Sequence, residues 1–139
     1  MSKNSDHTSA KMALRKGGGP PPGYEWTVMV LDQAYKEATT LLDNDQYAHM
    51  VAQVKELARE NEPTRCETVD VRKLGELHEI RDKWGILKRL NIRVFFYVES
   101  SQRLLIILGV INKTNDGSTP VVSRLLMEYR LRKFLASAV

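Results

Sequence analysis

Cationic side chains gather in one stretch of the sequence, between residues 81 and 93. Arg81 and Arg93 each lie in a run of residues that alternates like a β-strand, where successive side chains point to opposite faces. We predict that the two arginine-bearing faces coincide and form a positive surface that could hold a phosphate chain. The residues expected to bind substrate on this surface, next to the two arginines, are Lys83, Lys88, Arg89 and Tyr97.

Three strands are predicted to position these side chains. Residues 77–81 alternate, residues 92–98 are β-branched and aromatic, and residues 104–111 are apolar at odd and even positions alike, which is typical of a strand covered on both faces. A polar four-residue loop at 99–102 would join the last two strands as a hairpin. The three strands therefore predict an antiparallel meander.

The remaining elements are read from apolar spacing and from turn residues. A strand is predicted at 24–31, a helix from Asp32, as its N-cap, to residue 42, and a second helix at about 46–61, capped by residues 43–45. A closing helix from Pro120 to about residue 136 is expected to bury Val122, Leu125, Leu126, Tyr129 and Phe134. The order β-α-α-β-β-β-α predicts an α+β fold: a meander plus an N-terminal strand, a helical hairpin packed on one face, and a C-terminal helix.

Length and composition fit one domain at 24–139, preceded by a flexible tail at 1–23 that ends in a Gly- and Pro-rich hinge. The 139 residues are 42% hydrophobic and carry a formal charge of +4, a modest lean toward anionic partners. The single cysteine, Cys66, excludes an internal disulfide and is predicted to be buried and inert. The absence of a long apolar run predicts a cytoplasmic protein with no membrane segment.

Three motifs carry a resemblance to a known family. The string Leu-His-Glu-Ile-Arg at 77–81 is followed by Arg-Val-Phe-Phe-Tyr-Val at 93–98 and Leu-Gly-Val-Ile-Asn-Lys-Thr at 108–114, before a basic C-terminal helix. Their order and spacing resemble the RelE/ParE toxin superfamily of bacterial type II toxin–antitoxin modules, especially its HigB-like and phage-derived members. The resemblance implies the RelE-like βααβββα fold. It also implies a metal-independent mRNA endoribonuclease that needs no cofactor, acts on mRNA, usually on the ribosome, and is silenced by a cognate antitoxin.

The resemblance also implies site residues. Arg93 corresponds to the phosphate-binding arginine of the family, Arg81 to the arginine that closes the preceding strand, and Lys113 to the basic residue after the last strand. Tyr129 corresponds to the hydroxyl near the C-terminus. Glu79 stands where ribosome-dependent members often carry lysine, and it could act as a general base. We predict from these roles that Arg93→Ala abolishes growth arrest with little loss of stability.

Other interpretations of the same residues stay open. Arg81 and Arg93 could be structural ion-pair partners, and Tyr129 lies on an apolar stripe that suits core packing. A gyrase-directed toxin of the ParE type, or a protein that only binds an antitoxin or RNA, fits the same fold. Arginines tied to carboxylates would favour these binding functions. For His78 a core or boundary position is predicted, and for His49 a solvated surface position without a metal.

Overall fold

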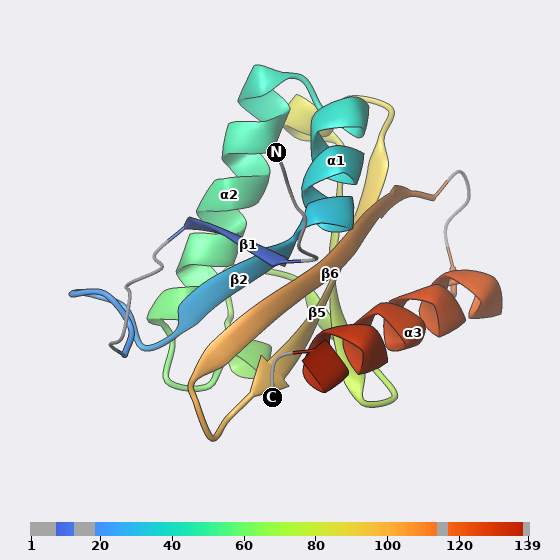
Figure 1. Cartoon of the computed structure of the whole chain (residues 1–139). Coiled ribbons are helices and arrows are strands. Elements are labelled where there is room, and N and C mark those ends of the chain that lie inside the picture. Colours follow the sequence, from blue (N-terminus) through green and yellow to red (C-terminus); the bar gives the residue numbers. More distant parts are fainter. Residues whose placement is uncertain (1–7, 13–18, 114–116, 138–139) are drawn as a thin grey trace, which may run out of the picture.

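The structure, a computed structural model, describes residues 8–12, 19–113 and 117–137 (Figure 1). The α+β class and the predicted series of strands and helices are confirmed. This series comprises β2 (Thr27–Leu31), α1 (Asp32–Leu41), α2 (Asn44–Arg59), β4 (Leu77–Lys83), β5 (Asn91–Glu99), β6 (Leu104–Asn112) and α3 (Val121–Ser137). Two short edge strands and two 3-10 turns are added, namely β1 (Thr8–Met12), η1 (Pro63–Arg65), β3 (Val71–Leu74) and η2 (Gly85–Leu87).

All six strands form one sheet in the order β1-β2-β6-β5-β4-β3. β4, β5 and β6 are the predicted antiparallel meander, and β2 runs parallel to β6, with Thr27 opposite Leu104 and Val30 opposite Ile107. The sequence pattern predicted neither edge strand. β1 lies in the segment predicted as a tail, most of which is outside the described residues, and it pairs antiparallel with β2.

The helical hairpin follows β2 directly. The sequence predicted Asp32 as the N-cap of α1, but Asp32 is the first helical residue, and its predecessor Leu31 caps the helix without a side-chain hydrogen bond. Asp43 does cap α2: its carboxylate accepts the Gln46 backbone N–H at 2.8 Å, and the Gln46 side chain accepts the Asp43 N–H at 3.0 Å. This reciprocal pair satisfies two of the backbone donors that a helix start leaves open.

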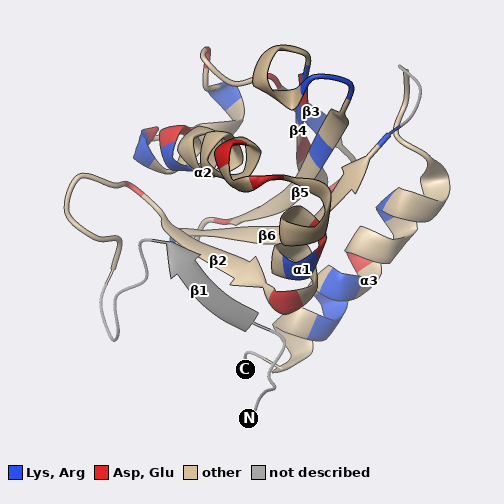
Figure 2. Ribbon diagram, turned by 90° about the horizontal axis from the view of Figure 1, so that it is seen from above, with Lys and Arg blue, Asp and Glu red and all other residues tan. Residues whose placement is uncertain are grey.

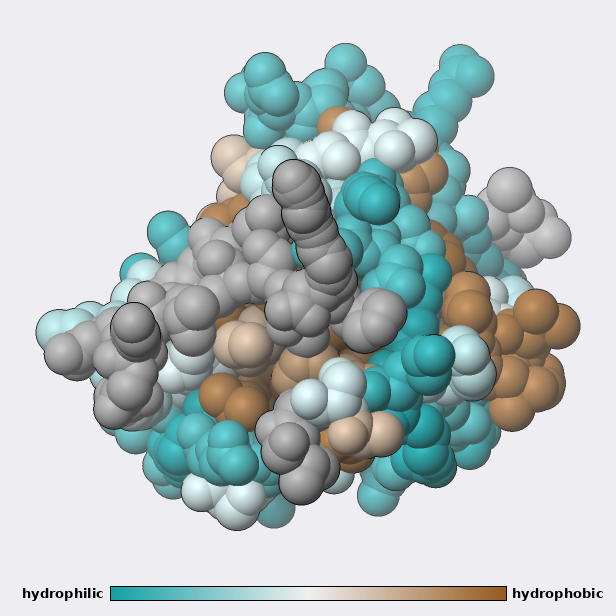
Figure 3. Space-filling model, in the orientation of Figure 1, coloured by the Kyte–Doolittle hydropathy of each residue, from teal (hydrophilic) through white to brown (hydrophobic). Residues whose placement is uncertain are grey.

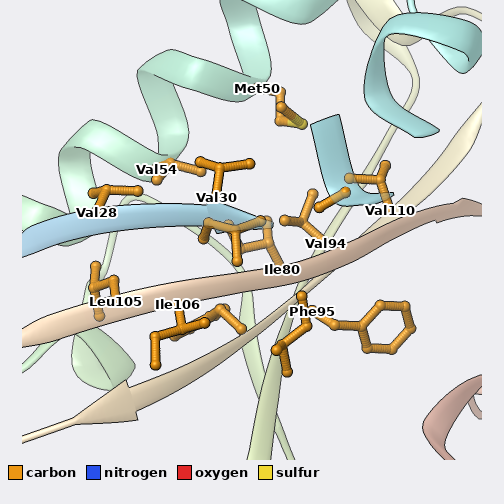
Figure 4. Close-up of a cluster of buried hydrophobic side chains, with 14 of the residues drawn as sticks. Val28, Val30, Met50, Val54, Ile80, Val94, Phe95, Leu105, Ile106 and Val110 are labelled. Carbon is orange, nitrogen blue, oxygen red and sulfur yellow. The ribbon is translucent and has the colours of Figure 1, made fainter. Parts of the chain in front are cut away.

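One face of the sheet packs against this hairpin. Val28, Val30, Val94 and Val110 point toward α2, where Met50 and Val54 meet them (Figure 4). Ala34 and Ala38 of α1 are also buried, because their small side chains let that helix lie close along β6. We call this surface the α2 face. The packing of these residues is apolar.

The opposite face, called here the α3 face, is covered by the closing helix. Gly109 makes a close approach possible, because a Cβ built there would lie 2.4 Å from the Met127 sulfur. A second link joins α3 to α1, since Arg130 Nη2 donates to Glu37 at 2.8 Å. The residues of α3 that are buried are Met127, Leu131 and Phe134.

The predicted buried stripe of α3 is wrong except for Phe134. Val122, Leu125, Leu126 and Tyr129 are exposed, by 78%, 57%, 44% and 60% respectively. The helix carries apolar residues on both sides, so their spacing does not show which side is buried. The close approach of Met127 to Gly109 determines the buried side. Within the described ranges, no helix is both long enough and apolar enough to cross a membrane.

Candidate functional site

The meander brings the two predicted arginines together. In the β4–β5 register Arg81 lies directly opposite Arg93, and Glu79 lies opposite Phe95. Their side chains share the α3 face, so the predicted coincidence of the two arginine-bearing faces is confirmed. Side chains directly opposite on neighbouring strands have Cβ atoms about 5 Å apart, so two guanidinium groups at this register require a counter-charge.

Glu79 supplies that counter-charge from a fully buried position. Its Oε2 atom accepts a hydrogen bond from Arg81 Nε at 2.8 Å and lies 3.5 Å from Arg93 Nη1, while the Thr119 hydroxyl donates to its Oε1. Arg93 is only 2% exposed, and it also donates to the Thr119 hydroxyl oxygen at 2.9 Å and to the Gly117 carbonyl at 3.0 Å. We call Glu79, Arg81, Arg93 and Thr119 the buried charge cluster.

The two arginines of the cluster differ in their exposure to solvent. Arg93 is enclosed and bonded on several sides, whereas the Arg81 side chain is 26% exposed. Glu79 lies too deep to take a proton from a ligand at the surface. Removing one member of such a cluster leaves an uncompensated buried charge, so the burial of Arg93 argues that Arg93→Ala reduces stability, unlike the expectation from sequence.

An open cleft of about 330 Å³ lies at the end of the meander where β4 ends and β5 begins. Four cations and two carboxylates contribute to its walls, with Asn91 and Gly117 completing them. The charged residues are Asp70, Arg72, Arg81, Asp82, Lys83 and Arg93. Figure 2 shows Lys and Arg near β3 and β4 and along α3. The excess of cations suits an anionic ligand.

The two carboxylates of the cleft are each engaged by a neighbour. Asp70 accepts two hydrogen bonds from Arg72, at 2.7 and 3.3 Å, and this pairing raises the pKa of the guanidinium. Asp82 lies 2.7 Å from the Nε2 atom of His49 on α2. His49 was predicted as a solvated surface residue; its side chain is 37% exposed, and the ion pair with Asp82 is what the sequence did not predict. Because 33 residues separate the pair, no local spacing in the sequence could reveal it.

The other predicted site residues are dispersed. Lys83 lines the cleft, but Lys88, Arg89, Tyr97, Lys113 and Tyr129 are not among its lining residues. Lys88 and Arg89 are exposed in the turn after η2, and the Lys113 backbone N–H donates to the Asn91 carbonyl at 2.8 Å. Tyr97 is half-buried on the α3 face. Tyr129 is exposed beside Lys133, whose Nζ lies 5.7 Å from the ring centroid. The alternative prediction, that Tyr129 packs in the core, is therefore wrong.

Two further predictions concern groups outside the cleft. His78 is half-buried and stacks on Phe96 with ring centroids 5.7 Å apart, as a boundary histidine would; burial and nearby Lys73 lower its pKa. Cys66 is buried, with its sulfur 3.3 Å from the Thr68 hydroxyl. Among the described residues, no three His, Cys, Asp or Glu side chains lie together as a metal site would require.

An exposed apolar surface runs along the first half of α3. Figure 3 shows it as a brown patch at the right edge of the molecule. We call it the α3 patch, and it consists of Val121, Val122, Leu125, Leu126 and Tyr129. Arg124 stands among these residues and pairs with Glu128 at 3.2 Å. A contiguous apolar patch on a basic helix is typical of a surface that binds another protein.

Comparisons with known proteins give one finding to place beside this geometry. No protein-family model matches the sequence, and no curated protein matches it. Among solved structures, the fold is similar to a chain from the crystal structure of the toxin–antitoxin complex RelBE2 from Mycobacterium tuberculosis. The similarity has a TM-score of 0.48 and 17% sequence identity, and it covers 66% of this chain and 95% of that chain.

Proposed function

We propose that this protein is the toxin of a type II toxin–antitoxin pair and that its cleft binds a phosphate group of RNA. One observation carries the proposal: Arg81, Lys83 and Arg93 converge with Asn91 on an open cleft of about 330 Å³. Arginine binds phosphate through paired hydrogen bonds, and lysine adds a mobile point charge. Two of the motifs that resemble the RelE/ParE superfamily lie on β4 and β5 and contribute Arg81 and Arg93 to this cleft.

The chemistry we propose is metal-independent cleavage of mRNA, with the ribosome as the setting and the cytoplasm as the location. The ribose 2′-oxygen loses its proton and bonds to the adjacent phosphorus while the bond to the 5′-oxygen of the next nucleotide breaks, which leaves a 2′,3′-cyclic phosphate and a 5′-hydroxyl that takes its proton from water. Arg81 and Lys83 would stabilise the charge that develops on the phosphoryl oxygens, an effect worth about 10²–10³ in rate for one donor. Asp82 also lines the cleft, with its carboxylate paired to His49 on the α2 side of β4, and we propose it as the group that accepts the 2′-hydroxyl proton.

Arg93 receives a different role from the one expected from sequence. Since its guanidinium is buried against Glu79 and Thr119, it positions Arg81 through the shared carboxylate. The proposed antitoxin would neutralise the protein by covering the cleft with an acidic segment or by binding the α3 patch with an amphipathic one. Both surfaces are available to such a partner in the part of the chain that the structure describes.

A second candidate function is non-catalytic, either a gyrase-directed toxin of the ParE type or a protein that only binds an antitoxin or RNA. The specific observation in its favour is the tie between both arginines and Glu79, which is the arrangement expected of a structural cluster. This candidate retains the α3 patch as a protein-binding surface and makes no use of Asp82.

Induced expression in a bacterial host tests the two functions together. Total RNA is followed by primer extension, and a reporter plasmid is followed by its supercoiling. Wild type should arrest growth and leave discrete mRNA cuts, and Lys83→Ala and Arg81→Gln should each lower cutting about 100- to 1000-fold. Arg65→Ala, which removes an arginine whose side chain is 80% exposed outside the cleft, should cut like wild type.

Two results would overturn the proposed nuclease activity. Growth arrest with intact mRNA and altered supercoiling would indicate gyrase as the target. Normal growth with soluble, folded protein would leave only a binding function. Circular dichroism of each purified variant separates loss of activity from loss of fold.

A further inference from the structure

The molecule contains two tryptophans with opposite environments. Trp26 is 3% exposed and lies under the Arg103 guanidinium, whereas Trp84 is 66% exposed. Trp84 belongs to the segment 83–90, which runs from the last residue of β4 to the residue before β5 and which we call the tryptophan loop. This loop carries Lys83, Lys88 and Arg89 and no carboxylate. An exposed indole among cations has no role in the core.

The backbone fixes the tryptophan loop in one shape. Leu87 is buried, and its N–H donates to the Trp84 carbonyl at 3.0 Å. The Gln46 side chain on α2 donates to the Ile86 carbonyl at 3.0 Å. Trp84 and Lys88 have φ angles of 70° and 59°, in the left-handed region that L side chains rarely adopt. Non-glycine residues in this region persist only where the surroundings impose them, and such residues cluster at binding sites.

The tryptophan loop begins at the cleft. Lys83 lines the cleft and is paired with Asn91, another lining residue, and Trp84 is the next residue in the chain. Consecutive Cα atoms are about 3.8 Å apart, so the indole starts at the rim of the cleft. Lys83 Nζ lies 5.5 Å from the centroid of the Trp84 ring, a cation–π distance that orients the two side chains together.

We propose that Trp84 is a stacking platform for a base of single-stranded RNA, with the phosphate beside that base in the cleft. The inference rests on the proposed function only in requiring that the cleft bind RNA phosphate. A flat aromatic face next to a cationic groove is the combination that binds single strands, because every base offers a π face and every linkage a negative charge. Lys88 and Arg89, which lie outside the cleft, then have a neighbouring phosphate to contact.

An acidic protein segment would satisfy the cations but would leave the indole face without a planar partner. The charges and the ring together therefore favour RNA. Binding of an acidic peptide at Trp84 is kept as an outcome of the test.

Fluorescence titration tests the platform without depending on cleavage. The probe is a short oligonucleotide with 2′-O-methyl sugars, which cannot undergo attack by the 2′-hydroxyl. Its bases should quench the exposed Trp84, while the buried Trp26 gives a constant background that a Trp84→Phe variant measures alone. Since Trp84→Ala lacks the indole that reports quenching, its affinity is read from the fluorescence anisotropy of a dye on the oligonucleotide, and it should be roughly 5- to 100-fold weaker than that of wild type, the range for loss of one stacked base. The affinity of Trp84→Phe should lie between that of wild type and that of Trp84→Ala.

Ile86→Ala is the matched control. It removes an exposed apolar side chain of the same loop, and it should bind within twofold of wild type. An abasic oligonucleotide of equal length should bind more weakly than the intact one and leave the Trp84 emission unquenched.

Unchanged affinity in a folded Trp84→Ala variant, equal quenching by the abasic probe, or quenching only by an acidic peptide would each overturn the platform alone. Failure of the wild type to bind any RNA probe would overturn both the platform and RNA binding by the cleft. Tight, quenching binding in a protein that cuts no RNA would support the platform while removing the nuclease.

Discussion

The two faces of the sheet differ in the chemical character of their buried side chains. On the α2 face, aliphatic side chains meet the helical hairpin in a continuous apolar layer (Figure 4). On the α3 face, a buried carboxylate and a buried guanidinium lie beneath the residues that lead into the helix, and the helix turns much of its apolar surface outward. Since buried ion pairs add little net stability over apolar packing, the α3 face reflects a requirement other than stability.

Removing the Glu79 carboxylate from the α3 face should have the largest effect on stability. Glu79→Ala leaves the Arg93 guanidinium buried without its counter-charge, so we expect a loss of about 3–5 kcal/mol in the free energy of unfolding. Urea denaturation followed by circular dichroism measures it. Glu79→Gln, which keeps the shape and a hydrogen-bond acceptor, should lose less. A Glu79→Ala variant as stable as wild type would show that the cluster is solvated in solution.

Equal leucine truncations on the two helices should sharpen the difference. Leu57 of α2 is fully buried, so Leu57→Ala should cost about 2–5 kcal/mol. Leu126 in the α3 patch is 44% exposed, and Leu126→Ala should change stability by no more than about 0.5 kcal/mol. Thermal melts of the two variants decide the point, and a large loss in Leu126→Ala would place this side chain in a core.

The smallest expected effect concerns pH. Burial lowers the pKa of His78 on the α2 face, so the unfolded chain binds a proton there before the folded chain does. Stability should therefore be constant above the unfolded pKa of about 6.5 and decrease as the pH falls from there to the lower folded pKa. Urea midpoints at pH 7.5 and pH 5.5 measure the decrease.

His78→Phe should reduce this pH dependence, because a ring that cannot titrate keeps the stack on Phe96. His49→Gln is the control for the other described histidine. If His78→Phe retained the full decrease, the titrating group would lie elsewhere.

Sequence predicted the meander well, because strand alternation fixes which side chains share a face once the register is known. That argument brought Arg81 and Arg93 together correctly but said nothing of depth, which depends on how residues 117–119 fold over Arg93. The buried side of α3 was misassigned because both sides of the helix are apolar. The pair of Asp82 and His49 joins distant segments, and no local pattern encodes it.

One hydroxyl joins the buried charge cluster to the start of α3. Thr119 lies two residues before α3 begins, and its hydroxyl bonds to Glu79 and Arg93. A ligand that pulls on the start of α3 therefore also disturbs the arginines behind the cleft. If α3 binds an antitoxin as proposed and the two surfaces are coupled in this way, thermodynamic linkage requires that an anion bound in the cleft change the affinity of α3 for the antitoxin by the same factor. Binding of the antitoxin at α3 and binding of substrate in the cleft would then be coupled through Thr119.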